Sequence, residues 1–164
     1  MNLKTLLVEK DPVVLSEAFV RSLSEIARQG ERAAVSPREE YDSTLLADIN
    51  CSCVYETTKD NGKVLRCAVG WLMDEAELAR FKKKSPSILV VVGELDIIPE
   101  SNAYGVLALL QQLHDRQRAK GDDFRECLID GLRRDRSRYA EVGITDETFA
   151  KGINAINSFM GEPL

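Results

Sequence analysis

The sequence predicts an α+β fold, in which a small antiparallel sheet (a central β-hairpin plus one strand) is covered by about five helices. Two observations lead to this prediction. A hairpin turn pattern stands at Asn61-Gly62, and apolar residues recur at helical spacing on both sides of it. With 164 residues, the chain has the length of a single domain, residues 1–164, and can bury a core without disulfides.

Two helices are predicted before the hairpin. The first begins at Asp11-Pro12, where aspartate caps the helix and proline takes its first position, and it ends at Gly30. Its apolar face contains Leu15, Phe19, Leu23 and Ile26. The second begins at the capping box Ser36-Pro37-Arg38-Glu39, and its apolar face contains Tyr41, Leu45 and Ile49. Upstream, Leu6-Leu7-Val8 is only a short apolar patch.

The hairpin is predicted to pair Cys51 to Thr57 with Val64 to Val69, since both runs are rich in β-branched and small apolar residues. Asn61 and Gly62 tolerate the positive φ that a tight turn demands.

Two registers of this hairpin remain open. A two-residue turn pairs Glu56 with Cys67, whereas a type I turn followed by a glycine bulge pairs Tyr55 with Cys67. We favour the bulged register, because it buries Tyr55 and Cys67 together on the face that also carries Cys51 and Cys53.

Gly70 follows the second strand and precedes Trp71. We expect it either to adopt a backbone conformation unfavourable to other residues or to allow the close approach of another element. Asp74 is predicted to cap the next helix, with Glu75 and Glu77 in its first turn.

Several short runs resemble a group of small phage and prophage proteins with the patterns C-x-Y, G-x-[KR]-C-A-V-G-x-L-[IM]-x-D-E and a later H-D. The matching runs are Cys53-Val54-Tyr55, Gly62-Lys63, Arg66-Cys67-Ala68-Val69-Gly70, Leu72-Met73, Asp74-Glu75 and His114-Asp115. The chain departs from the pattern at Trp71, where the group often has cysteine, and at Met73-Asp74, where a proline often intervenes. The resemblance implies a phage or mobile-element setting and no particular reaction.

The third strand is predicted at Ile88–Val92, five consecutive aliphatic residues that are typical of a buried strand. A helix follows from Asn102 to about Lys120, with His114 on its apolar face. The next helix, after Gly121, is predicted to turn Phe124, Cys127, Leu128 and Leu132 inward. The last begins at Thr145 and has an apolar face of Phe149, Ile153, Ile156 and Met160.

Charge limits the classes of partner. The net charge of −5 and the pI of about 5.1 argue against general binding to nucleic acid or an anionic membrane. The arginines at positions 133, 134, 136 and 138 are predicted to form a solvated helix face. No signal peptide or membrane span is recognised, so a cytoplasmic location is expected, in the host cell if the protein is phage-encoded.

Three thiols and the single histidine suggest two chemical alternatives. As zinc ligands, Cys51, Cys53, Cys67 and His114 have a suitable donor set, although Cys-x-Cys is tighter than the usual spacing. As an enzyme, Cys67 is the nucleophile, His114 the base and Asp115 the orienting acid. Adjacent helical side chains diverge by about 100°, which makes Asp115 a poor partner for His114.

We favour a third interpretation, in which the cysteines are small core residues and His114 is a buried, hydrogen-bonded histidine. Seven residues are expected to be structural: Tyr55, Asn61, Gly62, Cys67, Gly70, Trp71 and His114. No phosphate loop or dinucleotide fingerprint is present, so no cofactor is expected. The sequence therefore predicts a non-enzymatic accessory protein that binds a host or defence macromolecule, most simply a protein, and leaves a homo-oligomer open.

Overall fold

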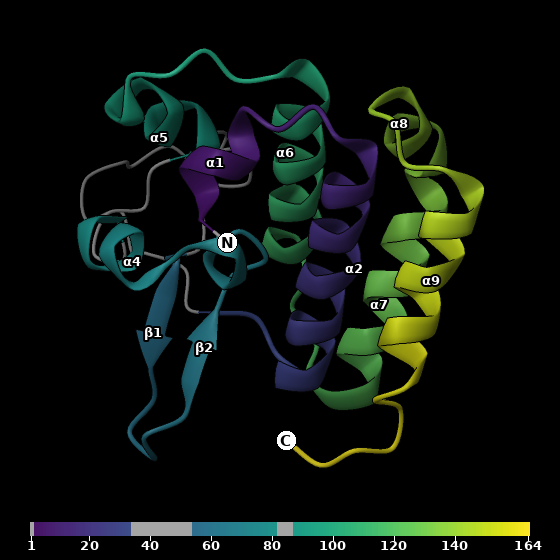
Figure 1. The fold of residues 1–164 in the computed structure, drawn as a ribbon. Helices are drawn as coiled ribbons and strands as arrows, with labels where there is room; N and C mark the ends of the chain where they lie inside the picture. Colours follow the sequence, from purple (N-terminus) through teal and green to yellow (C-terminus); the bar gives the residue numbers. More distant parts are fainter. Residues whose placement is uncertain (1, 34–53, 82–86) are drawn as a thin grey trace, which may run out of the picture.

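A computed structural model describes residues 2–33, 54–81 and 87–164. This part of the chain contains eight α-helices, one 3-10 helix and a two-stranded antiparallel sheet, so the α+β prediction is confirmed (Figure 1). The elements are α1 (Leu3–Leu7), α2 (Pro12–Gln29), β1 (Glu56–Thr58), β2 (Val64–Arg66), η1 (Gly70–Leu72), α4 (Glu75–Phe81), α5 (Ile88–Leu95), α6 (Ser101–Asp115), α7 (Gly121–Arg134), α8 (Arg136–Glu141) and α9 (Asp146–Asn157). The helix predicted from Ser36 and the thiols of Cys51 and Cys53 lie outside the described residues.

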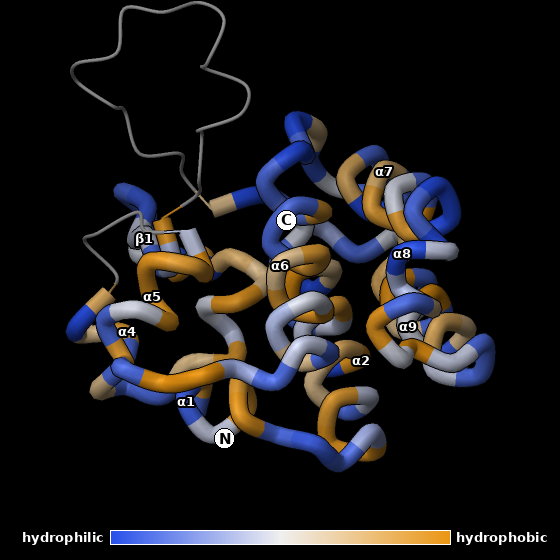
Figure 2. The backbone as a smooth tube through the Cα atoms, turned by 90° about the horizontal axis from the view of Figure 1, so that it is seen from above, coloured by the Kyte–Doolittle hydropathy of each residue, from blue (hydrophilic) through white to orange (hydrophobic). Residues whose placement is uncertain are grey.

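The longer helices α2, α6, α7 and α9 run side by side. The hairpin lies with α1, α4 and α5 on one side of this group, at the left of Figure 1. Helix α2 packs against α6 and α9, and α7 packs against α6 and α9. Figure 2 shows hydrophobic segments of these helices turned toward one another. The buried side chains between them include Phe19, Leu23, Ile26, Leu110, Leu128 and Ile156.

Local signals determine the ends of α2 as predicted. The Asp11 carboxylate accepts a hydrogen bond from the Val13 N–H at 2.9 Å, and Pro12 occupies the first helical position. Gly30 ends the helix with a left-handed φ of 72°, a conformation that L-residues with side chains adopt at a cost.

Helix α9 docks on the core as its apolar periodicity predicts. Thr145 caps it by accepting a hydrogen bond from the Thr148 N–H at 3.2 Å. Phe149 and Ile156 are buried, whereas Ile153 and Met160 are partly buried. Helix α7 differs from the prediction in one residue, because Cys127 is exposed while Phe124, Leu128 and Leu132 face the core.

Helix α1 was not predicted, because its run of apolar residues is shorter than a periodic pattern. Leu3, Leu6 and Leu7 are all buried. The Glu77 carboxylate in α4 accepts hydrogen bonds from the N–H groups of Leu3 and Lys4 at 2.7 and 2.8 Å, and from the Asp74 N–H at 3.1 Å. The helix predicted after Asp74 is confirmed, and Glu77 serves the amino ends of α1 and α4 together.

The prediction of a third strand is wrong, since Ile88–Leu95 forms helix α5. Ile88, Val91 and Val92 are buried, whereas Leu89 and Val90 are exposed. This spacing of three and four residues belongs to a helix and not to the alternation of a strand. Packing of the buried face against α6 outweighs the β preference of the valines, which is a weak local term. Within the described residues the sheet therefore has two strands.

The bulged hairpin register is confirmed. Glu56 pairs with Arg66 and Thr58 with Val64, and the Cys67 N–H donates to the Tyr55 carbonyl at 3.2 Å. Gly62 has a φ of 81°, as a three-residue loop with a glycine bulge requires. Both strands are shorter than predicted, and the chain from Val69 onward turns into η1.

Gly70 is required by close approach and not by its dihedral angles. Its φ lies outside the left-handed region, so the first of the two expectations is wrong. A Cβ atom at this position would collide with the backbone carbonyl of Tyr55. The second expectation, close approach of another element, is confirmed.

Helix α6 ends at Asp115 and not near Lys120. Side chains donate to two of its last carbonyls. The Gln117 amide donates to the Leu113 carbonyl at 2.6 Å, and Arg32 donates to the Asp115 carbonyl at 2.7 Å. None of the helices in the described ranges is long and apolar enough to cross a membrane.

Candidate functional site

Cys67, the proposed nucleophile, lies in the interior. Tyr55 and Cys67 are fully buried on the inner face of the hairpin, and the Cys67 sulfur accepts a hydrogen bond from the Gly70 N–H at 3.3 Å. Burial, with a further contribution from the negative charge of Asp115, raises the pKa of Cys67 to about 12. Burial likewise raises the pKa of Tyr55 far above its ordinary value. At neutral pH, Cys67 is therefore a protonated thiol and a poor nucleophile.

His114 is buried and has a partner on each ring nitrogen. Nδ1 lies 3.2 Å from Asp115 Oδ1, and the Ala33 N–H donates to Nε2 at 3.4 Å. This pattern assigns the proton to Nδ1 and leaves Nε2 occupied as an acceptor. The expectation that Asp115 points away from His114 is wrong, because Asp115 is the last residue of α6 and its side chain turns back toward the ring.

The metal alternative rests partly on residues for which no geometry is described. Cys51 and Cys53 lie outside the described ranges, and Cys67 and His114 have the protein partners given above. Among the described residues, no group of three or more histidine, cysteine, aspartate or glutamate side chains is arranged to hold a metal.

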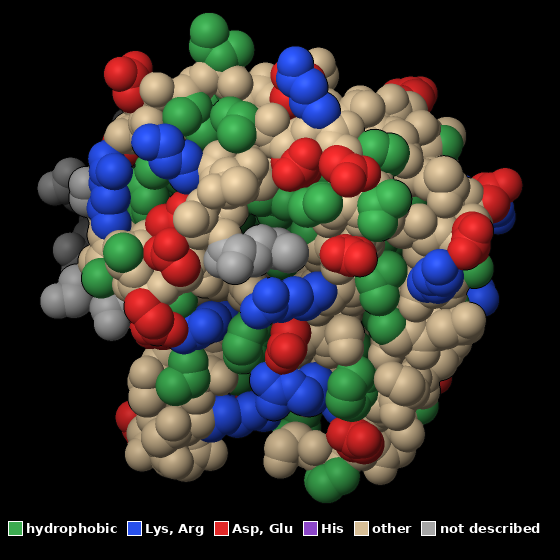
Figure 3. Space-filling view, viewed as in Figure 1, with side chains coloured by type: hydrophobic (Ala, Val, Ile, Leu, Met, Phe, Trp, Pro, Cys, Tyr) green, Lys and Arg blue, Asp and Glu red, His purple; other side chains and the backbone are tan. Residues whose placement is uncertain are grey.

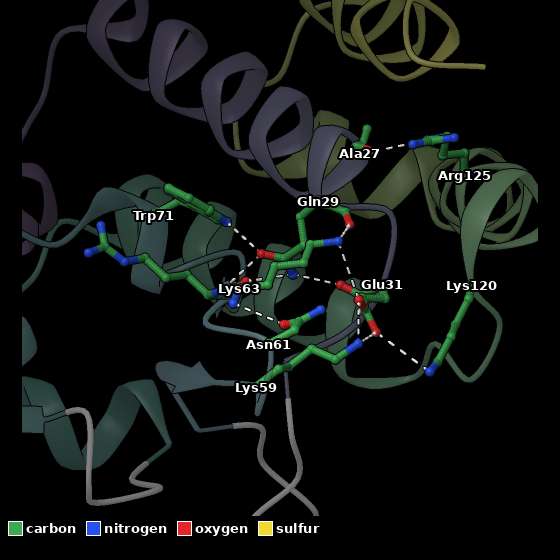
Figure 4. Close-up of polar contacts among 10 residues, drawn as sticks. Ala27, Gln29, Glu31, Lys59, Asn61, Lys63, Trp71, Lys120 and Arg125 are labelled. Carbon is green, nitrogen blue, oxygen red and sulfur yellow. Dashed lines mark hydrogen bonds and ion pairs between the residues drawn. The ribbon is translucent and has the colours of Figure 1, made fainter. Parts of the chain in front are cut away.

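Gln29, the last residue of α2, joins that helix to the hairpin and is 3% exposed. Its Oε1 accepts from the Arg66 N–H at 2.9 Å and from the Trp71 indole N–H at 3.2 Å. Its Nε2 donates to the carbonyls of Glu31 and Arg66 at 2.6 and 3.0 Å. Figure 4 shows this amide between the indole and the Glu31 segment. The amide therefore meets the backbone groups of Arg66 on the side of β2 away from β1.

Trp71 lies half-buried beside this amide, with two guanidinium groups over its ring. Arg28 and Arg66 stand 5.4 and 5.2 Å from its ring centre, within the range of cation–π attraction. The expectation of a structural role for Trp71 fits these contacts, since the indole connects α2, β2 and η1.

The Glu31 carboxylate forms ion pairs with lysines from two separate segments, and its side chain is only 6% exposed. Lys59 and Lys63 of the hairpin lie 3.0 and 3.4 Å away, and Lys120, just before α7, lies 3.6 Å away. Figure 4 shows the ammonium groups of Lys59 and Lys120 converging on it. Burial alone raises the pKa of Glu31, but hydrogen bonds and charges from Lys59 and Lys63 outweigh burial and lower the pKa below 4.5.

An open groove of about 580 Å³ lies beside this carboxylate. Its walls are the segment after α2, the hairpin loop and the link between α6 and α7; its charged lining is Glu31, Arg32, Lys59, Asp60, Arg118 and Lys120. We call it the Glu31 groove. On the face seen in Figure 3, Lys and Arg side chains are interspersed with Asp and Glu side chains between the hairpin and the lower ends of the helices.

Two guanidinium groups of the Glu31 groove are held by backbone and not by carboxylates. Arg32 and Arg118 both donate to the Asp115 carbonyl, at 2.7 and 2.8 Å, and Arg118 also donates to the Gln117 carbonyl at 3.0 Å. Within the described part of the chain, neither has a carboxylate partner. Their charges are thus held in position, and no described carboxylate pairs with them.

Sequence reasoning missed Gln29, Glu31 and the Glu31 groove. Lys59, Lys63 and Lys120 are scattered along the sequence, and each alone resembles an ordinary surface lysine. A signal was present in Gln29-Gly30-Glu31, because polar residues on either side of a helix stop are free to face another element. No family model, curated protein or solved structure matches this chain.

Proposed function

We propose that this protein is a non-enzymatic accessory protein of a phage or mobile element, which binds a host or defence protein in the cytoplasm through the Glu31 groove. The setting comes from the sequence resemblance described above. The observation that supports binding at this place is the concentration of fixed, incompletely neutralised cations around an open groove.

The structure provides one of the contacts that the enzyme alternative requires, between Asp115 and His114. It provides neither a free base nor an accessible thiolate. The 3.2 Å approach of Asp115 to His114 is the geometry expected of an orienting acid. However, His114 Nε2 already accepts a backbone hydrogen bond, and the Cys67 thiol is buried with a raised pKa. A thiol enzyme needs an accessible thiolate beside a free base, so binding is the better-supported function.

The test is capture of partners from an extract of the natural host cell with three forms of the full chain. These are the wild type, the double variant Lys59→Gln/Lys120→Gln, and the control Lys151→Gln. Lys151 lies on α9, is 63% exposed and pairs with Glu147, so its loss removes a lysine charge away from the groove.

We expect the same protein to be captured by the wild type and Lys151→Gln, and to be lost with the double variant. Site-specific photo-crosslinking from position 118, in the groove wall, should label that protein. Equal capture by all three forms would assign binding to another surface. If the wild type turned over a substrate and the Cys67→Ser variant did not, the enzyme alternative would be established instead.

A further inference from the structure

We infer that the partner segment entering the Glu31 groove is acidic, with Asp or Glu side chains that pair with Lys59, Lys120, Arg32 and Arg118. This inference rests on the proposed function and specifies the chemistry of its partner. The geometry points to carboxylates because cations surround the groove on three walls.

Charge at the groove is opposite to charge of the whole molecule. Lys59, Lys63 and Lys120 share the single carboxylate of Glu31, so their combined positive charge exceeds its negative charge. Arg32 and Arg118 add guanidinium groups that contact only carbonyls in the described residues. The chain as a whole carries −5. An acidic segment is therefore attracted to the Glu31 groove and repelled by the negatively charged remainder of the protein.

Glu31 also prepares the lysines for this contact. An isolated lysine loses rotamer entropy when it is fixed on a ligand. Here the buried carboxylate already orients Lys59, whose side chain is 37% exposed, while Lys120 stays 64% exposed at the edge. Each ammonium has three N–H donors, so hydrogens remain for an incoming carboxylate. The arginines are restrained in the same way by the Asp115 carbonyl.

A nucleic acid is a weaker candidate for this groove. Single-stranded nucleic acids bind where bases stack on aromatic side chains along a basic path. The described lining contains no aromatic residue and is interrupted by the carboxylates of Glu31 and Asp60. A long polyphosphate would also extend beyond the groove and meet the acidic remainder of the molecule.

The test is an NMR titration of the full chain with a short glutamate-rich peptide and, separately, with the glutamine peptide of the same length. We expect amide shifts at residues 57–63 and 117–120 with the glutamate peptide alone. Lys120→Gln should weaken binding about two- to fivefold, the effect of removing one exposed ion pair. Raising the salt from about 50 to about 300 mM should weaken it further.

Lys151→Gln is the matched control and should leave the affinity unchanged. Lys120→Arg tests for misfolding, because it keeps the charge and should retain binding. Equal binding of both peptides, shifts spread over the surface, or an unchanged affinity in Lys120→Gln would overturn the inference. Tighter binding of a single-stranded oligonucleotide at residues 57–63 would overturn it in favour of nucleic acid.

This result can be separated from a failure of the proposed function. If the captured host protein depends on Lys59 and Lys120 but the glutamate peptide does not bind, the proposed function stands and the acidic chemistry is wrong. If the peptide binds the groove but no host protein depends on these lysines, the groove chemistry is correct and the proposed function fails.

Discussion

The backbone carbonyl of Tyr55 lies too close to Gly70 to leave room for a Cβ atom there. Gly70→Ala must therefore push β1 away from η1, and we expect a loss of about 1–3 kcal/mol in the free energy of unfolding, as for an overpacked core. Chemical denaturation monitored by circular dichroism measures this loss.

Gly93→Ala is the control for Gly70→Ala. Gly93 lies in α5, and a Cβ atom added there would have nothing within 4 Å. Alanine is the better helix former, so this variant should be unchanged or slightly more stable. Equal stability of Gly70→Ala and wild type would show that the hairpin can move at no cost.

Cys67 and Cys127 differ in burial and should differ in reactivity. The pKa of Cys67 is raised to about 12, whereas Cys127 is exposed on α7. Because the thiolate is the reactive form, we expect iodoacetamide to alkylate Cys67 more slowly than Cys127 by at least about a hundredfold. Peptide mass spectrometry distinguishes the two sites. Rapid labelling of Cys67 in the folded protein would restore the enzyme alternative.

At the scale of the secondary-structure element, helix α5 is tested by three neighbouring valines. Val91 and Val92 are 0% and 8% exposed, and Val90 is 48% exposed. In a helix, Val91→Ala and Val92→Ala should each cost about 1–3 kcal/mol, since each removes two buried methyl groups. Val90→Ala should cost little, because alanine has the higher helix propensity.

Thermal and chemical unfolding of these three variants gives the comparison. A strand with one buried face would separate Val91 from Val92, because adjacent residues of a strand point to opposite faces. A large cost for Val91→Ala beside a negligible cost for Val92→Ala would therefore contradict the helix.

Helix α9 contributes stability through its buried face. Ile156 is 0% exposed, and we expect Ile156→Ala to lower the free energy of unfolding by about 2–5 kcal/mol. Lys151→Ala on the exposed face is the control and should change it by less than about 0.5 kcal/mol. Urea denaturation measures both, and equal stability of the two variants would show that α9 is not docked in solution.

At the scale of the whole molecule, Glu31 connects the end of α2, the hairpin and the link before α7. Its pKa in the folded protein is lowered from 4.5. A carboxyl group whose pKa is lowered by folding stabilises the folded state at any pH above its pKa in the unfolded chain. This contribution is lost as the pH falls through the pKa of the folded state.

Glu31→Gln should therefore be less stable than the wild type near neutral pH, with a difference that shrinks as the pH falls below 4.5. Urea denaturation across this pH range measures it. A difference that stays constant with pH would show that the ion pairs of Glu31 do not stabilise the fold.

Local signals in the sequence determined α2, α9 and the hairpin turn, and they favoured the register that the structure shows. Asp11-Pro12, Gly30 and Thr145 mark helix ends because caps act within one turn. Gly62 marks the turn because glycine adopts a positive φ without a steric cost, and the common burial of Tyr55 and Cys67 favoured the bulged register. These signals also placed Tyr55, Cys67 and His114 in the interior, since each shares a face with apolar neighbours.

Only the tertiary structure decided the identity of α5 and the composition of the Glu31 groove. Ile88–Val92 satisfies a strand pattern locally, but burial against α6 makes Ile88–Leu95 a helix. Glu31 and Lys120 are brought together by the packing of α2 against α6 and of α6 against α7. Ion pairs of this kind leave no periodic trace, because their partners come from distant segments and any exposed lysine satisfies the local sequence equally well.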